Sequence, residues 1–280
     1  MKTIGLLSVL FTGILLMIAV VDFPDWGDPH SPANSYLSPH YIVDVEEETA
    51  VPNMVTAVLA DYRAFDTMLE TSVVFVAGIA IFAILRSIDG ASLAGTTRRL
   101  QRRGRSKKEK RKGKGRNQRD EMEMAAAAER EAAKPDLIVQ TTVRLLIPTI
   151  QLFALYVIAH GHHSPGGGFQ GGVILAAGLI LVAMSFGLEN TLARVPEKLS
   201  LQLGNLGVLI FAGTGVLCLL LGANFLDYHV LTAIYPATDE IMARSHSMLV
   251  VEIGVGFTVM SMLYLIYANL SSHGDMKKGL

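Results

Sequence analysis

Cysteine and tryptophan are nearly absent from this chain of 280 residues, which contains one of each. The single cysteine, Cys218, lies inside an apolar run. The chain therefore has no internal disulfide and no paired cysteines spaced as metal ligands. We expect Cys218 to serve in packing, and we predict neither a bound metal nor an organic cofactor.

Charge is missing from long stretches of the chain, and 51% of all residues are hydrophobic. Crossing the hydrocarbon core of a bilayer takes about 20 apolar residues as a helix. Unpaired backbone groups are costly there, and no run alternates as a barrel strand does, so the sequence predicts an all-α polytopic membrane protein. The six expected transmembrane helices are residues 3–21, 68–85, 137–159, 173–188, 201–222 and 247–267. The first is too long for a signal core and is expected to be retained.

Lysine and arginine are absent from residues 3–62, whereas thirteen of them lie between Arg98 and Arg119. The positive-inside rule then puts the basic segment and both termini in the cytoplasm and residues 22–67 outside, in a multi-pass cell (inner) membrane protein. No aromatic residues interleave the basic ones, so we expect contact with anionic lipid headgroups and not with nucleic acid.

The basic segment also divides the chain into two membrane modules. Residues 1–86 hold two predicted helices and an acidic outer loop, and residues 135–280 hold the other four. Between them, residues 87–134 form a basic, low-complexity linker. The sequence therefore predicts a 2 + 4 arrangement.

Three histidines and six glycines gather in residues 160–172, between two apolar runs. His160, His162 and His163 titrate near neutral pH, but their spacing fits no zinc site. The glycines favour a tight turn and close contacts with helices or with a neighbouring subunit. A proton relay through one imidazole is the alternative function of the segment. The glycines concerned are Gly166, Gly167, Gly168, Gly171 and Gly172.

A second motif, residues 53–70, precedes the second predicted helix. Asp66 and Glu70 are four residues apart, and Arg63 precedes Asp66 by three, so all three share one helix face. Two neighbouring carboxylates oppose simultaneous ionisation while an arginine holds one of them charged, which suits a proton relay. The alternative is a water-facing helix start whose acids are favoured by the helix dipole.

Glu252 lies inside the last apolar run, where an acid costs about 2.5–3.5 kcal/mol on insertion scales. Acids at such depth are rare, so we predict that Glu252 exchanges a proton or binds Na⁺. The alternative is a carboxyl hydrogen-bonded to a neighbouring helix, with Gly254 and Gly256 indicating a close contact. Arg144 and Arg244 are possible counter-charges, but snorkelling to an interface is the preferred interpretation of both. His246 is expected to make a polar contact at a helix end.

Both motifs resemble known sequences. Residues 160–172 resemble the signature loop of the B subunit of multisubunit Na⁺/H⁺ antiporters, of the Mrp or Mnh type, and of the equivalent subunit in related membrane-bound hydrogenases. Residues 53–70 resemble the end of the large A subunit of the same antiporters, although Leu69 stands where that pattern has glycine. The resemblance covers residues 53–70 and most of 137–270.

The resemblance implies a noncatalytic membrane subunit of a complex that exchanges Na⁺ for H⁺ together with several other subunits. In one interpretation, Glu252 and the pair Asp66 and Glu70 bind or relay ions. In the other, the chain is a scaffold whose glycine faces support ion-carrying partners. A third possibility is an antiporter-like subunit of an energy-converting hydrogenase or respiratory complex.

Overall fold

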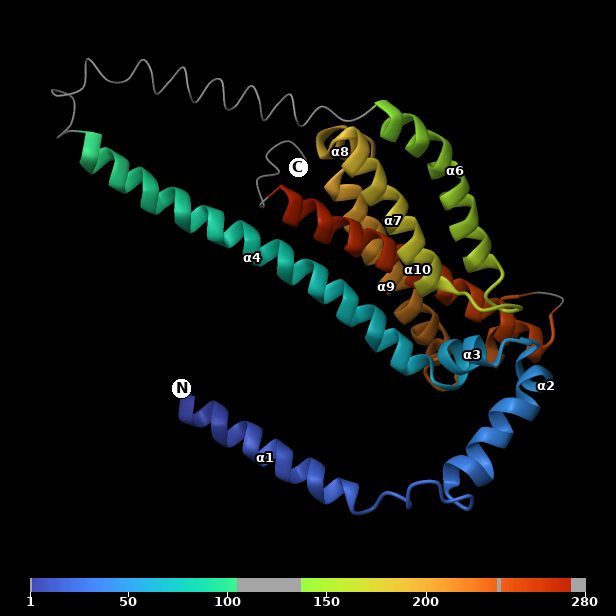
Figure 1. Ribbon diagram of the computed structural model, residues 1–280. Helices are drawn as coiled ribbons and strands as arrows, with labels where there is room; N and C mark the ends of the chain where they lie inside the picture. The colour runs from blue at the N-terminus through green and yellow to red at the C-terminus, as the bar shows by residue number, and fades with distance from the viewer. Residues whose placement is uncertain (1, 105–136, 236–237, 273–280) are drawn as a thin grey trace. The chain divides into compact units, whose positions relative to one another are not determined.

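The computed structural model describes the backbone of residues 2–104, 137–235 and 238–272, and side chains in 3–85, 137–235 and 238–272. Within these ranges every regular element is a helix, which confirms the all-α fold (Figure 1). Six helices are long and apolar enough to cross a membrane, as predicted. They are α1 Lys2–Val20, α4 Ala64–Gly104, α6 Leu137–Ala159, α7 Gly168–Phe186, α9 Glu197–Leu220 and α10 Glu240–Ser271.

The chain forms two compact units, Met1–Glu48 and Thr49–Leu280. The first unit contains α1, whose apolar side chains are all exposed within that unit. After α1, the π-helical segments η1 (Ala33–Leu37) and η2 (His40–Asp44) lead into the short helix α2 (Val45–Thr49). An apolar helix with so little protein around it needs lipid or another subunit to cover it.

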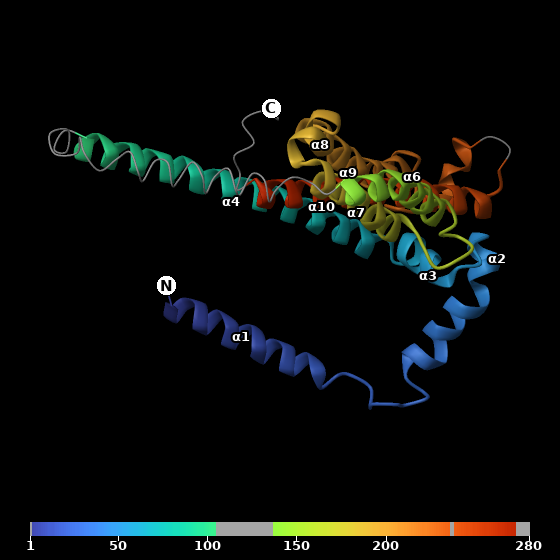
Figure 2. The same cartoon turned by 45° about the horizontal axis from the view of Figure 1, so that its top comes forward.

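The second unit is built around α10, which packs against α9, α7 and α4 (Figure 2). Its remaining elements are short: α3 Met54–Ala57, η3 Val58–Tyr62, α8 Leu188–Arg194 and the 3₁₀ helix η4 Tyr228–Ala233. Of the α10 span, 61% is buried, compared with 17% of the α6 span. The core of the unit therefore follows the length of α10.

Small residues allow the helices around α10 to approach closely. A methyl group added at Gly207 of α9 would overlap the backbone oxygen of Gly254 on α10. Thr258 of α10 donates its hydroxyl hydrogen to the backbone oxygen of Gly204 over 3.0 Å. Close backbone approach and hydrogen bonds of this kind hold helices together in lipid, where no hydrophobic force does so. The contact predicted around Gly254 is thus confirmed.

Four helices begin several residues earlier than the hydropathy pattern predicts. Among them, α9 begins at Glu197 and α10 at Glu240. α4 begins at Ala64, directly after Arg63, whose non-helical backbone (φ −124°, ψ 33°) separates it from η3. α7 begins at Gly168, so the second half of the glycine run is helical. α4 continues to Gly104, into the predicted linker, and residues 105–134 of that linker lie outside the described residues.

Candidate functional site: an acidic chamber

A cavity of about 140 Å³ lies among the 53–70 motif, the glycine run and the middle of α10. We call it the acidic chamber, because two carboxylates, Glu70 and Glu252, take part in its wall. The rest of the wall is mixed: polar side chains lie among the aliphatic and aromatic ones. Its other polar side chains are Thr56, Thr67 and Gln170. The structure thus brings together residues that the sequence separates by nearly two hundred positions.

Glu252 is 9% exposed and lies against the glycine run. The backbone of Gly168 hydrogen-bonds its carboxylate, while Oε2 is buried and has no hydrogen-bond partner in the described part of the chain. Methyl groups added at Gly161 and Gly167 would lie 3.0 Å and 2.6 Å from its two carboxylate oxygens. Glu252, which the sequence singles out because acids are rare inside apolar runs, is therefore surrounded by the backbone of the glycine motif.

The glycines divide into two groups. Gly166 and Gly167 lie in the turn, and Gly167 has φ +121°, a conformation that favours glycine. Gly168, Gly171 and Gly172 lie inside α7, so the prediction of a tight turn is wrong for these three. Their role is close helix contact: a methyl at Gly168 would overlap the Glu252 carbonyl oxygen, and one at Gly172 would lie 2.9 Å from the Gly256 oxygen.

The two acids at the start of α4 have different surroundings. Asp66 forms an ion pair with Arg63, with 2.5 Å between Oδ2 and Nη2, and both side chains are more than half exposed. Glu70 lines the acidic chamber, whereas Asp66 and Arg63 do not. The structure therefore groups Glu70 with Glu252, and Asp66 with Arg63.

Asn53 joins the motif of residues 53–70 to the loop of residues 160–167 by hydrogen bonds. Its side-chain amide donates to the backbone oxygens of Gly161 and Ser164 over 2.7 and 2.8 Å. Thr56 donates its hydroxyl hydrogen to the same Gly161 oxygen over 2.8 Å, and the Asn53 N–H donates to the oxygen of His162. These bonds fix the turn that contacts Glu252.

The three loop histidines have unequal environments. His160 is exposed and stacks on Tyr156, with ring centroids 4.4 Å apart, and His163 is exposed beside it. His162 is 8% exposed, and its Nδ1 lies 3.5 Å from the Ser245 hydroxyl. Burial, helped by the nearby charges of His163 and His246, lowers the pKa of His162 below its ordinary value.

Arg244 forms an ion pair with Asp61, which agrees with the alternative interpretation of this arginine as a counter-charge. The Arg244 Nε donates to Asp61 Oδ2 over 2.6 Å, and the guanidinium lies over the ring of Tyr62. Asp61 is 8% exposed and Arg244 22%. Asp61 also contributes, after burial, to raising the pKa of Tyr228 well above its ordinary value. Sequence reasoning missed Asp61 because no pattern distinguishes it from other acids at a helix end.

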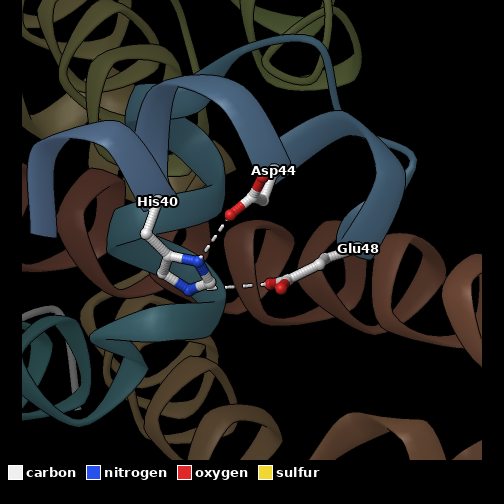
Figure 3. Close-up of side chains that lie close together, drawn as sticks. All are labelled: His40, Asp44 and Glu48. Carbon is white, nitrogen blue, oxygen red and sulfur yellow. Dashed lines mark hydrogen bonds and ion pairs between the residues drawn. The ribbon is translucent and has the colours of Figure 1, made fainter. Parts of the chain in front are cut away.

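A separate group of titratable residues lies in the Met1–Glu48 unit (Figure 3). His40 Nδ1 is 3.0 Å from Asp44, and its Nε2 is 3.8 Å from Glu48. The three offer one atom each within 4.8 Å, which is the donor set of a weak divalent-cation site. All three are partly exposed, and the imidazole–carboxylate contacts account for the cluster without an ion.

Comparison with protein-family models identifies two domains. Residues 138–265 match a domain related to the MnhB subunit of Na⁺/H⁺ antiporters. Over these residues the chain is similar to the MnhB family. Residues 25–102 match a second family, MbhE, which is the E subunit of MBH. The acidic chamber lies between these two domains, because Glu70 belongs to the MbhE match and Glu252 to the MnhB domain.

Individual relatives agree with these matches. Proteins of Staphylococcus aureus strains Newman and JH1, named antiporter subunit mnhB2, are each 29% identical over 136 residues, which is 49% of this chain and 94% of the relative. The chain is also similar to a chain of the membrane-bound sulfane sulfur reductase, an archaeal respiratory membrane complex. In that case the identity is 25% and the TM-score 0.59, over 96% of this chain and 97% of the other.

The fold also recurs in the Mrp complex from Dietzia sp. DQ12-45-1b. There all of this chain aligns with 26% of a longer chain, at 21% identity and a TM-score of 0.57. Both domains of the present chain thus have counterparts within single chains of known structure.

Proposed function

We propose that this chain is a membrane subunit of a multisubunit cation/proton antiporter-type complex, in which its acidic chamber forms part of the passage for protons or cations. The MnhB domain and the antiporter subunits related to it support the first part. The single observation that carries the second part is that Glu70 and Glu252, from two different family domains, line one cavity.

The chamber has the properties that an ion passage requires. At roughly 30 Å³ per water molecule in the liquid, 140 Å³ accommodates a few waters. Two carboxylates, hydroxyl groups and the Gln170 amide give those waters hydrogen-bond partners. Glu252 lies in the interior of an apolar helix, where a carboxyl is expensive unless protons, cations or water reach it. We therefore expect the two carboxyl groups that line the chamber to exchange protons or to bind Na⁺.

The proposed membrane placement follows from the charge distribution. The basic linker and both termini lie in the cytoplasm, near anionic headgroups, and the loop around His162 lies outside. The partners are the other subunits of the complex, which cover the apolar faces left exposed on α1 and α6. The chain itself carries out no covalent chemistry and needs no cofactor.

A respiratory setting is the second candidate. It is favoured by the likeness to the sulfane sulfur reductase complex, which extends over nearly the whole of both chains. In that setting the same chamber would couple ion movement to electron transfer in other subunits. Identification of the copurifying subunits distinguishes the two settings, because redox subunits are present only in the second.

The decisive experiment replaces Glu252 by Gln, which keeps the side-chain size and removes the titrating group. Na⁺-driven proton movement is measured in vesicles containing the complete complex, and copurification verifies assembly. We expect exchange to be lost in E252Q and kept in E240Q, because Glu240 is an exposed acid at the start of the same helix. Wild-type exchange by an assembled E252Q complex would leave only a scaffold function for this chain.

A further inference from the structure

His162 combines two properties that its neighbours in the loop lack. It is 8% exposed, and its Nε2 atom is buried without a hydrogen-bond partner among the described residues. Its other nitrogen, Nδ1, lies at the limit of hydrogen-bond distance from the Ser245 hydroxyl, 3.5 Å away. Buried polar atoms are nearly always paired with protein or water, so this exception calls for an explanation.

The position of His162 relative to Glu252 supplies one. Ser245 and Glu252 are seven residues apart on α10, which places them on nearly the same helix face about 10 Å apart. Gly161, the residue before His162, lies directly against the Glu252 carboxylate. Glu252 Oε2 is itself a buried atom without a partner within the described ranges. His162 therefore lies beside Ser245, on the face of α10 that carries Glu252 two helical turns away, and the side chains of His162 and Glu252 each have one buried atom without a hydrogen-bond partner among the described residues.

We propose that His162 is the proton-exchanging group between the aqueous end of the helix bundle and the carboxyl of Glu252. The inference rests on the proposed function of the acidic chamber and names the side chain that supplies it. In the forward step, His162 takes up a proton from water at the outer end. The imidazolium N–H bond then breaks, the proton passes along intervening water molecules, and an O–H bond forms on the Glu252 carboxylate. The imidazole is left neutral, so charge and protons balance.

The electrostatic surroundings suit an imidazole that both accepts and releases protons. Within the loop, His163 faces His162, and from α10 His246 does so; both, after burial itself, lower the pKa of His162. The charged groups on the neighbouring turns of α10 are Arg244, paired with Asp61, and Glu252. A depressed pKa keeps the resting imidazole neutral near pH 7, with a lone pair free for a proton.

The test uses the complete complex in vesicles and compares H162Q with H163Q, which removes an exposed imidazole from the adjacent position. Na⁺-driven proton movement is followed from pH 5 to pH 9, in steps of about half a unit, a range centred on histidine titration. We expect H162Q to lose at least about tenfold in rate and to lose the histidine limb of the pH profile, with H163Q within about twofold of wild type. A wild-type rate and pH profile in an assembled H162Q complex would overturn the proposal.

Should H162Q fail to assemble, Ser245→Ala decides, because it keeps the imidazole and removes the hydroxyl beside Nδ1. We expect its pH midpoint of exchange to shift, and an unchanged midpoint and rate would contradict the relay. E252Q, measured in parallel, separates a failure of the His162 relay from a failure of the proposed function of the acidic chamber. Loss of exchange in E252Q with normal exchange in H162Q overturns the relay alone, whereas normal exchange in E252Q overturns the function of the chamber as well.

Discussion

Arg244 of α10 donates to Asp61 of η3 over 2.6 Å, and this ion pair joins the MbhE domain to the MnhB domain. Asp61 is 8% exposed, so its charge is removed from most of its water. Removing one partner of such a pair leaves the other charge uncompensated in a poorly solvated place. The pair is therefore a sensitive point of the contact between the two domains.

Replacing Asp61 by Asn is expected to lower the thermal midpoint of the purified complex by destabilising this contact. A double-mutant cycle with Arg244→Gln should give a coupling energy of about 1–3 kcal/mol. The exposed pair of Arg63 and Asp66 is the control, with an expected coupling below about 1 kcal/mol. Equal coupling in the two cycles would show that burial of Asp61 contributes nothing.

Gly168 tests the approach of α7 to α10. A methyl group there would overlap the Glu252 carbonyl oxygen, and the backbone on both sides leaves no room to adjust. We expect Gly168→Ala to cost about 1–3 kcal/mol through overpacking and to lower the yield of assembled complex. Gly213→Ala is the matched control, because Gly213 lies inside α9 with no atom of the described chain within 4 Å of an added methyl. A stability loss as large in G213A would remove the steric explanation.

Replacing Asn53 tests how the motif of residues 53–70 holds the turn of residues 160–167. Its amide bonds to the oxygens of Gly161 and Ser164 are lost in Asn53→Ala. Hydrogen exchange of the peptide covering residues 160–168 should become faster, because the turn then opens locally more often. Asn190→Ala, which loses one exposed bond to Phe186, should leave that peptide unchanged. Unaltered exchange in N53A would mean that the turn is held by other contacts.

The sequence is sufficient to predict the six transmembrane helices and to single out Glu252. Hydropathy identifies the six helices because the bilayer fixes the length of an apolar run. Glu252 stands out because charges are rare at such depth. Asp66 and Glu70 were singled out by helical spacing, which describes neighbours on one helix and says nothing of distant ones.

The sequence does not show which helix faces meet in the folded chain. Glu70 and Glu252 share a chamber only because α4 and α7 pack on the same part of α10, and local periodicity does not encode that choice. The partner of Arg244 is hidden from the sequence for the same reason: snorkelling is the default for an arginine near a helix end, and Asp61 lies far away in the sequence. The sequence also does not divide the glycine run between turn and helix, because tight turns and close helix packing favour the same residue.

Glu70 and Asp66 provide a test within the motif of residues 53–70. Glu70→Gln removes a titrating group from the chamber, so we expect slower Na⁺-driven proton movement, by about tenfold or more. Asp66→Asn changes a carboxylate one turn away that does not line the chamber, and its expected effect on transport is less than about twofold. A larger loss in D66N than in E70Q would place the passage along the outer face of α4 instead of in the chamber.

His162 also makes a prediction about stability against pH. Its pKa is lower in the folded state than the ordinary value near 6.5, so the unfolded chain binds more protons between the two values. Its contribution to stability is therefore complete above about pH 6.5 and is lost as the pH falls toward the lowered folded-state pKa. The thermal midpoint of the wild-type complex in detergent should fall on acidification through this window, and H162Q should fall less steeply. H163Q, which removes an exposed imidazole, is expected to keep the steepness of the wild type. Parallel curves for wild type and H162Q would show that burial of this imidazole does not govern its protonation.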